Sequence, residues 1–185
     1  MWTIARWMSV ALAGMVLGIG GRALATASQP GVLVNQFGQP VPQSELNGHY
    51  LLVYFGYTHC PDICPTTLET LTTVLDQLKP VHPNLRALFV TVDPGRDTVP
   101  MLRDYLAHFS PQIWGLTGSP AEIAGAEAAF GVPVQPPSAD GEIAHGAFIY
   151  FMGPDGKLIK AYPAEVAADA LLKALRAKLE PGKAN

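Results

Sequence analysis

Residues 50–66 of this 185-residue chain read Tyr-Leu-Leu-Val-Tyr-Phe-Gly-Tyr-Thr-His-Cys-Pro-Asp-Ile-Cys-Pro-Thr, and they contain both of its cysteines, Cys60 and Cys64. The apolar run at 50–55 predicts a buried strand, and the spacing of apolar residues over 66–78 predicts an amphipathic helix. The cysteines therefore lie at a strand-to-helix junction. If the first turn of the helix extends back to them, a spacing of four places both sulfurs on one helix face. Such a pair can form a disulfide or bind one soft metal ion.

The ordinary explanation of two cysteines is a structural disulfide or, in a reducing compartment, two small buried hydrophobic residues. A disulfide across four positions closes a very small loop, and it therefore restricts the unfolded chain little. Pro61 and Pro65 flank the pair and stiffen the loop. A helix N-terminus lowers the pKa of a nearby thiol. We therefore expect a reactive or metal-binding thiolate pair.

The N-terminal residues indicate export. A single positive charge in residues 1–7 is followed by an uninterrupted apolar run over 8–21, then by Arg22 and the Ala-x-Ala pattern of residues 23–27. Residues 1–27 are predicted to be a cleaved signal peptide or, as the alternative, a retained membrane anchor. In either case residues 28–185 are expected outside the cytoplasm, in the periplasm, either free or anchored to the outer face of the inner membrane, where conditions are oxidising.

The composition of the remaining chain suits one domain and excludes a nucleic-acid partner. The net charge is −3 for the whole sequence, and it becomes −5 without residues 1–27, which hold two arginines and no acidic residue. A mildly acidic surface disfavours binding to phosphate backbones. No charge run, low-complexity tract or internal repeat interrupts residues 28–185, and we expect a single domain there.

Predicted strands and helices alternate through this domain. After a short hairpin around Phe37-Gly38 and a turn at 44–48, the predicted elements are strand 50–55, helix 66–78, strand 85–92, helix 98–109, strand 113–116, helix 119–130, strands 146–151 and 157–161, and helix 164–179. This order predicts an α/β fold with a central mixed sheet, helices on both faces and an added N-terminal hairpin. The cysteine pair after the first core strand indicates a thioredoxin-like fold. Its spacing differs from Cys-x-x-Cys by one additional residue.

His145 is the candidate for a third functional group. It follows a polar loop and precedes a strand of the same sheet. A solvated loop histidine is the alternative, but two cysteines and one histidine form a three-coordinate site suited to copper. His59 adjoins Cys60, and side chains of neighbouring residues tend to point apart, so we expect His59 beside the ligands and not among them.

Residues 54–65, the segment Phe89-Val-Thr-Val-Asp-Pro-Gly-Arg-Asp-Thr98, the segment 115–118, and His145 with Gly153-Pro-Asp-Gly156 together resemble the SCO/SenC family of copper chaperones for cytochrome c oxidase. The resemblance runs from about Gly31 to the end of the chain. It implies a thioredoxin-like domain, usually tethered to the membrane, that binds one copper ion per chain through Cys60, Cys64 and His145.

The resemblance also implies a partner. This is subunit II of cytochrome c oxidase, to whose binuclear copper centre the protein delivers copper or whose cysteines it reduces; other periplasmic copper chaperones or thiol reductants are further expected partners. Asp93 and Arg96 match the family's Asp-Pro-x-Arg-Asp motif, which implies a role in ordering the loops beside the metal. Many relatives have Asp before the histidine and Ser or Thr after it, where this chain has Ala144 and Gly146. We therefore expect a backbone group to orient His145.

Three other functions stay open on the sequence. The main alternative is an enzyme, a thiol:disulfide reductase that uses Cys60 and Cys64 on partner cysteines and carries no metal. A peroxide-reducing enzyme is suggested by Thr58, two residues before Cys60, but the proline and the distant resolving cysteine of such sites are missing from this sequence. The third is an exported domain with a structural disulfide. A metallochaperone fits the combined motifs better than any of these.

Overall fold

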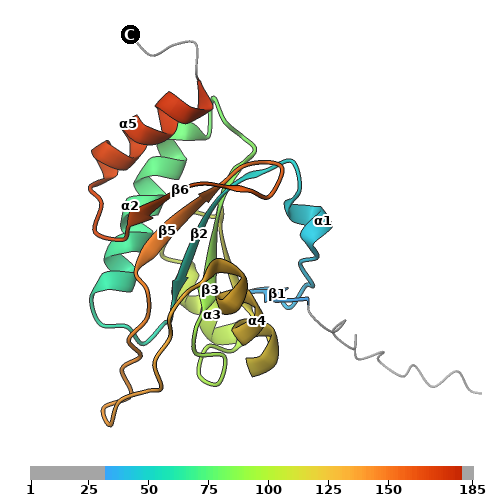
Figure 1. Cartoon of the computed structure of the whole chain (residues 1–185), viewed down its shortest axis with the longest axis vertical. Coiled ribbons are helices and arrows are strands. Elements are labelled where there is room, and N and C mark those ends of the chain that lie inside the picture. Colours follow the sequence, from blue (N-terminus) through green and yellow to red (C-terminus); the bar gives the residue numbers. More distant parts are fainter. Residues whose placement is uncertain (1–31, 181–185) are drawn as a thin grey trace, which may run out of the picture.

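A computed structural model describes residues 32–180, and the predicted signal or anchor at 1–27 lies outside this range. These residues contain a six-stranded sheet with the strand order β1-β4-β3-β2-β5-β6 (Figure 1). Strands β2, β3 and β4 run parallel, while β1, β5 and β6 each run antiparallel to the neighbour nearer the centre. The strands are β1 Val34–Asn35, β2 Tyr50–Gly56, β3 Leu85–Thr91, β4 Ile113–Thr117, β5 Phe148–Met152 and β6 Leu158–Pro163.

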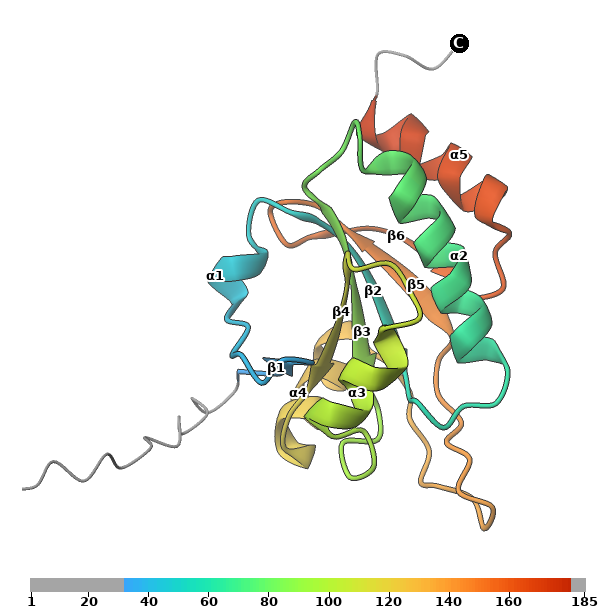
Figure 2. The same cartoon turned by 180° about the vertical axis from the view of Figure 1, so that it is seen from behind.

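Helices lie on both faces of the sheet. They are α1 Gln43–Leu46, α2 Ile63–Leu78, α3 Val99–Leu106, α4 Pro120–Phe130 and α5 Ala168–Leu179. Figures 1 and 2 show α2, α3 and α5 on one face, with α1 and α4 toward the other. This arrangement confirms the predicted thioredoxin-like α/β fold. Within residues 32–180, no helix combines the length and the apolar character needed to cross a bilayer.

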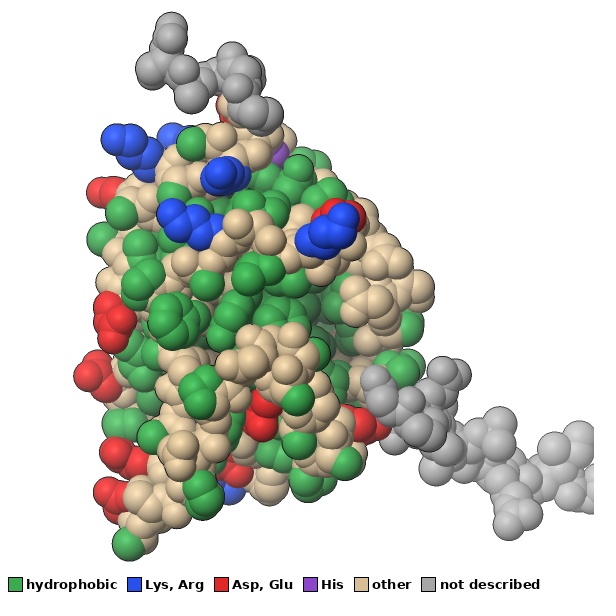
Figure 3. Space-filling model, viewed as in Figure 1, with side chains coloured by type: hydrophobic (Ala, Val, Ile, Leu, Met, Phe, Trp, Pro, Cys, Tyr) green, Lys and Arg blue, Asp and Glu red, His purple; other side chains and the backbone are tan. Residues whose placement is uncertain are grey.

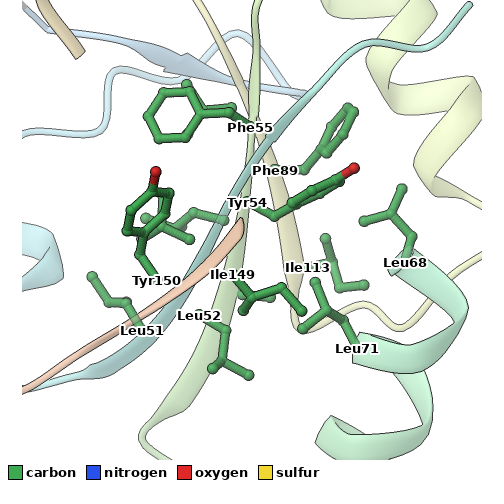
Figure 4. Close-up of a cluster of buried hydrophobic side chains, with 14 of the residues drawn as sticks. Leu51, Leu52, Tyr54, Phe55, Leu68, Leu71, Phe89, Ile113, Ile149 and Tyr150 are labelled. Atoms are coloured by element: carbon green, nitrogen blue, oxygen red, sulfur yellow. The ribbon is translucent and has the colours of Figure 1, made fainter. Parts of the chain in front are cut away.

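The core has two layers because side chains alternate along each buried strand. Tyr54 and Phe89 are paired across β2 and β3 and point toward α2, where Leu68 packs against them (Figure 4). Phe55 and Tyr150 point to the opposite face, and their rings meet at 90° with centroids 6.3 Å apart. Strand β2 is thus buried on both faces, as its continuous apolar run predicts.

Local sequence signals agree with the observed turns and caps. Ser119 and Glu122 form the predicted capping box at the start of α4, and Gly131 ends that helix with φ of 64°. The N-terminal hairpin is confirmed, since the Val41 N–H donates to the Leu33 carbonyl at 2.8 Å. Gly156 has φ of 75° in the predicted β5–β6 turn.

Several predicted boundaries are wrong, among them the end of α3, which lies at Leu106 and not at 109. Helix α2 begins at Ile63 and not at residue 66, because a proline such as Pro65 is tolerated in the first turn, where its missing N–H is not needed. The last helix begins at Ala168 and not at 164, because the Ala164 N–H donates to the Ala147 carbonyl and ties this residue to the sheet. Residues 43–46 form one helical turn instead of a simple turn.

Candidate functional site

The two cysteines lie side by side where β2 leads into α2. Cys60 is in the connecting loop and its side chain is almost buried, whereas Cys64 is the second residue of α2 and is fully buried. Both thiols are free, and Cys60 lies close enough to Cys64 to contribute to the pKa shift of its thiol. The loop is tightened by a hydrogen bond from the Cys60 N–H to the Tyr57 carbonyl at 3.3 Å. The sulfurs are therefore placed to bind one ion together or to form a disulfide.

The expected lowering of the thiol pKa is wrong for Cys64. Burial raises the pKa of the Cys64 thiol to about 12, even though the Tyr54 hydroxyl and the Tyr57 backbone N–H both act in the opposite direction. Desolvation outweighs these hydrogen bonds because the sulfur is enclosed by the core. At neutral pH this thiol holds its proton until a partner, such as a metal ion, replaces it.

Gly56 makes room for the buried sulfur. A Cβ atom at this position would lie 2.9 Å from Cys64 Sγ and 2.7 Å from Phe89 Cε2. Real side chains do not approach so closely, so the last residue of β2 has to be glycine for Cys64 to pack as it does.

His145 comes from the long loop before β5 and lies against the aromatic residues of the cysteine segment. Its ring meets those of Tyr54 and Tyr57 edge-on, at centroid distances of 6.4 and 6.0 Å. Its Nδ1 lies 3.3 Å from the Gly146 carbonyl, which is the backbone partner that the sequence predicts. Burial lowers the pKa of His145, so the neutral imidazole that a metal requires is favoured.

The structure thus brings His145 to the same end of the sheet as the cysteines. Tyr54 connects them, since its ring contacts His145 and its hydroxyl donates to Cys64 Sγ at 3.4 Å. Within residues 32–180, however, no three His, Cys, Asp or Glu side chains are close enough to hold a metal ion. His145 is therefore a neighbour of the thiol pair and is not in contact with both sulfurs.

Asp93 and Arg96 lie in the loop after β3, between the cysteine segment and the loop of His145. The Arg96 guanidinium pairs with Asp93 and also donates to the Gly141 carbonyl at 2.8 Å, in the loop that leads to His145. His59 is half exposed, and its Nδ1 lies 3.0 Å from Thr58 Oγ1. None of these three side chains is grouped with the cysteines as a ligand set.

Asp97 is a site residue that the sequence analysis missed. Its side chain is fully buried and accepts hydrogen bonds from the Thr58 N–H, the Thr58 hydroxyl and the Thr91 hydroxyl, at 3.0, 2.6 and 2.7 Å. The structure places Thr98, and not Asp97, at the N-cap of α3. Asp97 ends the Asp-Pro-Gly-Arg-Asp segment, and no local pattern of the sequence separates it from an ordinary helix N-cap.

A sequence model described as SCO1/SenC matches residues 22–180, most of the chain. The chain belongs to the SCO1/SenC family. Among its relatives, the SCO2 homolog of Danio rerio mitochondria is 42% identical over 136 residues, which cover 70% of this chain and 49% of the zebrafish protein. This SCO1/SenC chain therefore spans about half the length of that relative.

Solved structures of the family resemble this one. The Arabidopsis thaliana ScoI structure with copper bound has a TM-score of 0.76 at 32% identity and covers 81% of this chain and 96% of its own. BsSco, described as a member of the Sco family of cytochrome c oxidase assembly proteins with a disulfide switch, has a TM-score of 0.66 at 29% identity, with 79% and 89% covered.

The SCO1/SenC domain also has an apolar cavity of about 850 Å³ on the face of α1 and α4. Figure 3 shows apolar side chains gathered in the middle of this face. The cavity is lined by β2 and β3 residues such as Val53, Phe55 and Val90, whose side chains point away from α2. Neither cysteine nor His145 lines it, so it is separate from the candidate site.

Proposed function

We propose that this chain is a copper chaperone for cytochrome c oxidase that binds one copper ion through Cys60, Cys64 and His145. The observation that carries the proposal is the pair of adjacent free thiols at the β2–α2 junction, with a neutral imidazole held beside them on a separate loop. The copper-bound structure of a family member supports the choice of metal.

The donor set suits this cargo. Thiolate sulfur and imidazole nitrogen are the ligands that copper prefers in proteins. Since Cys64 is protonated at neutral pH, copper binding releases at least this proton. His145 has to approach the sulfurs to become the third ligand, and we propose that its loop makes this movement. A ligand on a separate loop can also detach first, which would let a recipient exchange ligands one at a time.

The recipient and the location follow from the same proposal. We propose that the protein is exported to the periplasm by residues 1–27, as a cleaved or membrane-anchored form, and that residues 28–185 act there. The recipient would be subunit II of cytochrome c oxidase, whose binuclear copper centre needs both copper and reduced cysteines. The similarity to BsSco, a member of a family of cytochrome c oxidase assembly proteins, supports this assignment.

A copper titration tests the proposal. The reduced chain is mixed with copper(I) in the presence of a colorimetric copper(I) chelator, and the bound copper is measured for the parent, Cys60→Ser, Cys64→Ser and His145→Ala. We expect one copper per chain, complete loss of tight binding with either serine variant and weakened binding with His145→Ala. Equal binding by the parent and the serine variants would refute the proposal.

The thiol:disulfide reductase remains the second candidate, and the different burial of the two cysteines favours it. The more accessible Cys60 thiolate would attack a partner disulfide and form a mixed disulfide, which Cys64 then resolves. The products are two partner thiols and one Cys60–Cys64 disulfide, so two electrons and two protons pass to the partner. A parent chain that binds no copper but reduces a disulfide substrate, unaffected by His145→Ala, would favour the reductase.

A further inference from the structure

Residues 93–97, in the loop between β3 and α3, contact both segments that carry the proposed ligands. We call these residues the brace. On one side Asp97 bonds to Thr58, which is 39 positions earlier and two residues before Cys60. On the other side Arg96 bonds to the Gly141 carbonyl, four residues before His145. Two consecutive residues of the brace thus hold the two ligand-bearing segments.

The brace is itself held together by hydrogen bonds. The Thr91 hydroxyl donates to Asp97 and accepts from the Asp93 N–H at 2.9 Å. The Asp93 carboxylate pairs in turn with Arg96. A continuous chain of polar contacts therefore runs from Thr58 to the loop of His145.

The burial and hydrogen bonding of Asp97 suit it to hold the cysteine segment in place. Its carboxylate is fully buried, which is costly unless its oxygens are hydrogen-bonded. Its carboxylate accepts from three donors, and two of the three belong to Thr58. Hydrogen bonds to an ionised acceptor are about twice as strong as neutral ones. The cysteine loop is thus held at Thr58 by two hydrogen bonds to one buried carboxylate.

We propose that Asp97 is a positioning residue that fixes the cysteine loop for copper binding, while Arg96 separately fixes the loop of His145. This inference rests on the proposed function. Neither residue is proposed to touch the metal; each acts through the segment it holds. The brace would set the distance between the thiol pair and the histidine before copper arrives.

Two disruptive substitutions, two conservative ones and one control test the role of Asp97. Asp97→Ala removes all three acceptor contacts. Thr58→Val keeps the shape of the side chain and removes the hydroxyl, with its contacts to Asp97 and to His59. Asp97→Asn and Thr58→Ser are the conservative rescues. In Asp97→Asn the amide oxygen can still accept from the Thr58 N–H, and the Thr58 hydroxyl can turn to accept from the amide nitrogen. Thr58→Ser keeps the hydroxyl. Thr73→Val is the matched control, since the Thr73 hydroxyl bonds only within α2 and is exposed.

The experiment measures copper(I) affinity by chelator competition, using the reduced full-length chain purified in detergent. Each variant is made in two backgrounds, one that keeps His145 and one that carries His145→Ala. We expect Asp97→Ala and Thr58→Val to weaken binding about 10- to 100-fold in both backgrounds. Arg96→Met should weaken binding more when His145 is present than in His145→Ala, because the Arg96 guanidinium donates a hydrogen bond to the histidine loop. The two rescues and Thr73→Val should stay within about threefold of their parent.

A second readout needs no copper. Release of the cysteine loop should raise the alkylation rate of Cys60 about tenfold in Thr58→Val, as expected for the loss of one charge-assisted hydrogen bond. Arg96→Met, which also removes the guanidinium from over the Tyr57 ring at 5.8 Å, should raise this rate less than Thr58→Val does. If the parent binds no copper, the proposed function fails, and the alkylation rates still decide whether Asp97 holds the cysteine loop.

Parent-like affinity and alkylation in Thr58→Val, with far-ultraviolet circular dichroism showing a folded chain, would overturn the inference. Weakening by Arg96→Met of equal size with and without His145 would also overturn the division of roles. Asp97→Ala alone could lose its fold, since it leaves buried donors unpaired. Thr58→Val, which keeps the backbone contact to Asp97, decides the question in that event.

Discussion

The Tyr54 hydroxyl donates a hydrogen bond to the sulfur of Cys64 at 3.4 Å, and both side chains are fully buried. Tyr54 belongs to β2 and Cys64 to α2, so this contact joins the sheet to the helix that carries one of the proposed ligands. The same ring contacts His145. Tyr54 is thus in contact with two of the three proposed copper ligands.

Replacing Tyr54 with phenylalanine should weaken copper binding and stability together. The hydroxyl favours the Cys64 thiolate, and its loss should lower copper(I) affinity severalfold and the free energy of unfolding of the reduced protein by about 1 kcal/mol. Chelator competition and urea denaturation measure the two effects. Tyr150→Phe, on the opposite face of the sheet, is the control and should leave copper affinity unchanged; equal effects of both variants would contradict the specific role of Tyr54.

Gly56→Ala should destabilise the domain by about 1 to 3 kcal/mol, because the new methyl group collides with Phe89 and with Cys64 Sγ. The measurement is urea denaturation of the reduced protein. Gly125→Ala in α4 is the matched control, since no atom lies within 4 Å of its Cβ position. It should stabilise the domain by about 0.5 to 1 kcal/mol, as alanine does in helices. A neutral Gly56→Ala would show that the sulfur can pack elsewhere.

The stability of the copper-free protein should fall as the pH drops through about 6.5. Burial lowers the pKa of His145 below its ordinary value of 6.5, so in this range the unfolded chain binds the proton more readily than the folded one. Protonation of His145 therefore favours unfolding, and the contribution of the neutral imidazole to the free energy of unfolding is fully present above pH 6.5. Thermal melts between pH 5 and 7.5 should show a smaller fall in melting temperature on acidification for His145→Gln than for the parent. His108→Gln, at an exposed position, should melt like the parent across the range.

Alkylation should distinguish the two thiols. Cys60 is slightly exposed and Cys64 is not, and the reacting species is the thiolate. In the Cys60→Ser variant, Cys64 is the thiol that remains. Because burial raises the pKa of Cys64 to about 12, its alkylation rate should still increase about tenfold per pH unit between pH 8 and 10. Mass spectrometry of the parent should find the first label on Cys60. A rate for Cys64 that levels off near pH 9 would contradict the burial of its sulfur.

Much of the fold was predictable because its signals are local. The apolar run of β2, the capping box of Ser119 and the glycine turn before β6 each depend on residues within a few positions of one another. The central mixed sheet with helices on both faces follows from the order of these elements. The start at Ala168 was missed because it depends on a contact outside the helix, the hydrogen bond from the Ala164 N–H to the Ala147 carbonyl. The start at Ile63 was missed because Pro65 is tolerated in the first turn of α2.

By itself, the sequence determined the order of the elements, the spacing of Cys60 and Cys64 and the motifs that mark the family. Only the tertiary structure decided the chemical state of Cys64 and the role of Asp97. The pKa of a thiol depends on how much water reaches it, and the packing of α2 against β2 and β3 removes that water. Asp97 meets Thr58 only after β2 and β3 align in parallel, which no local pattern encodes.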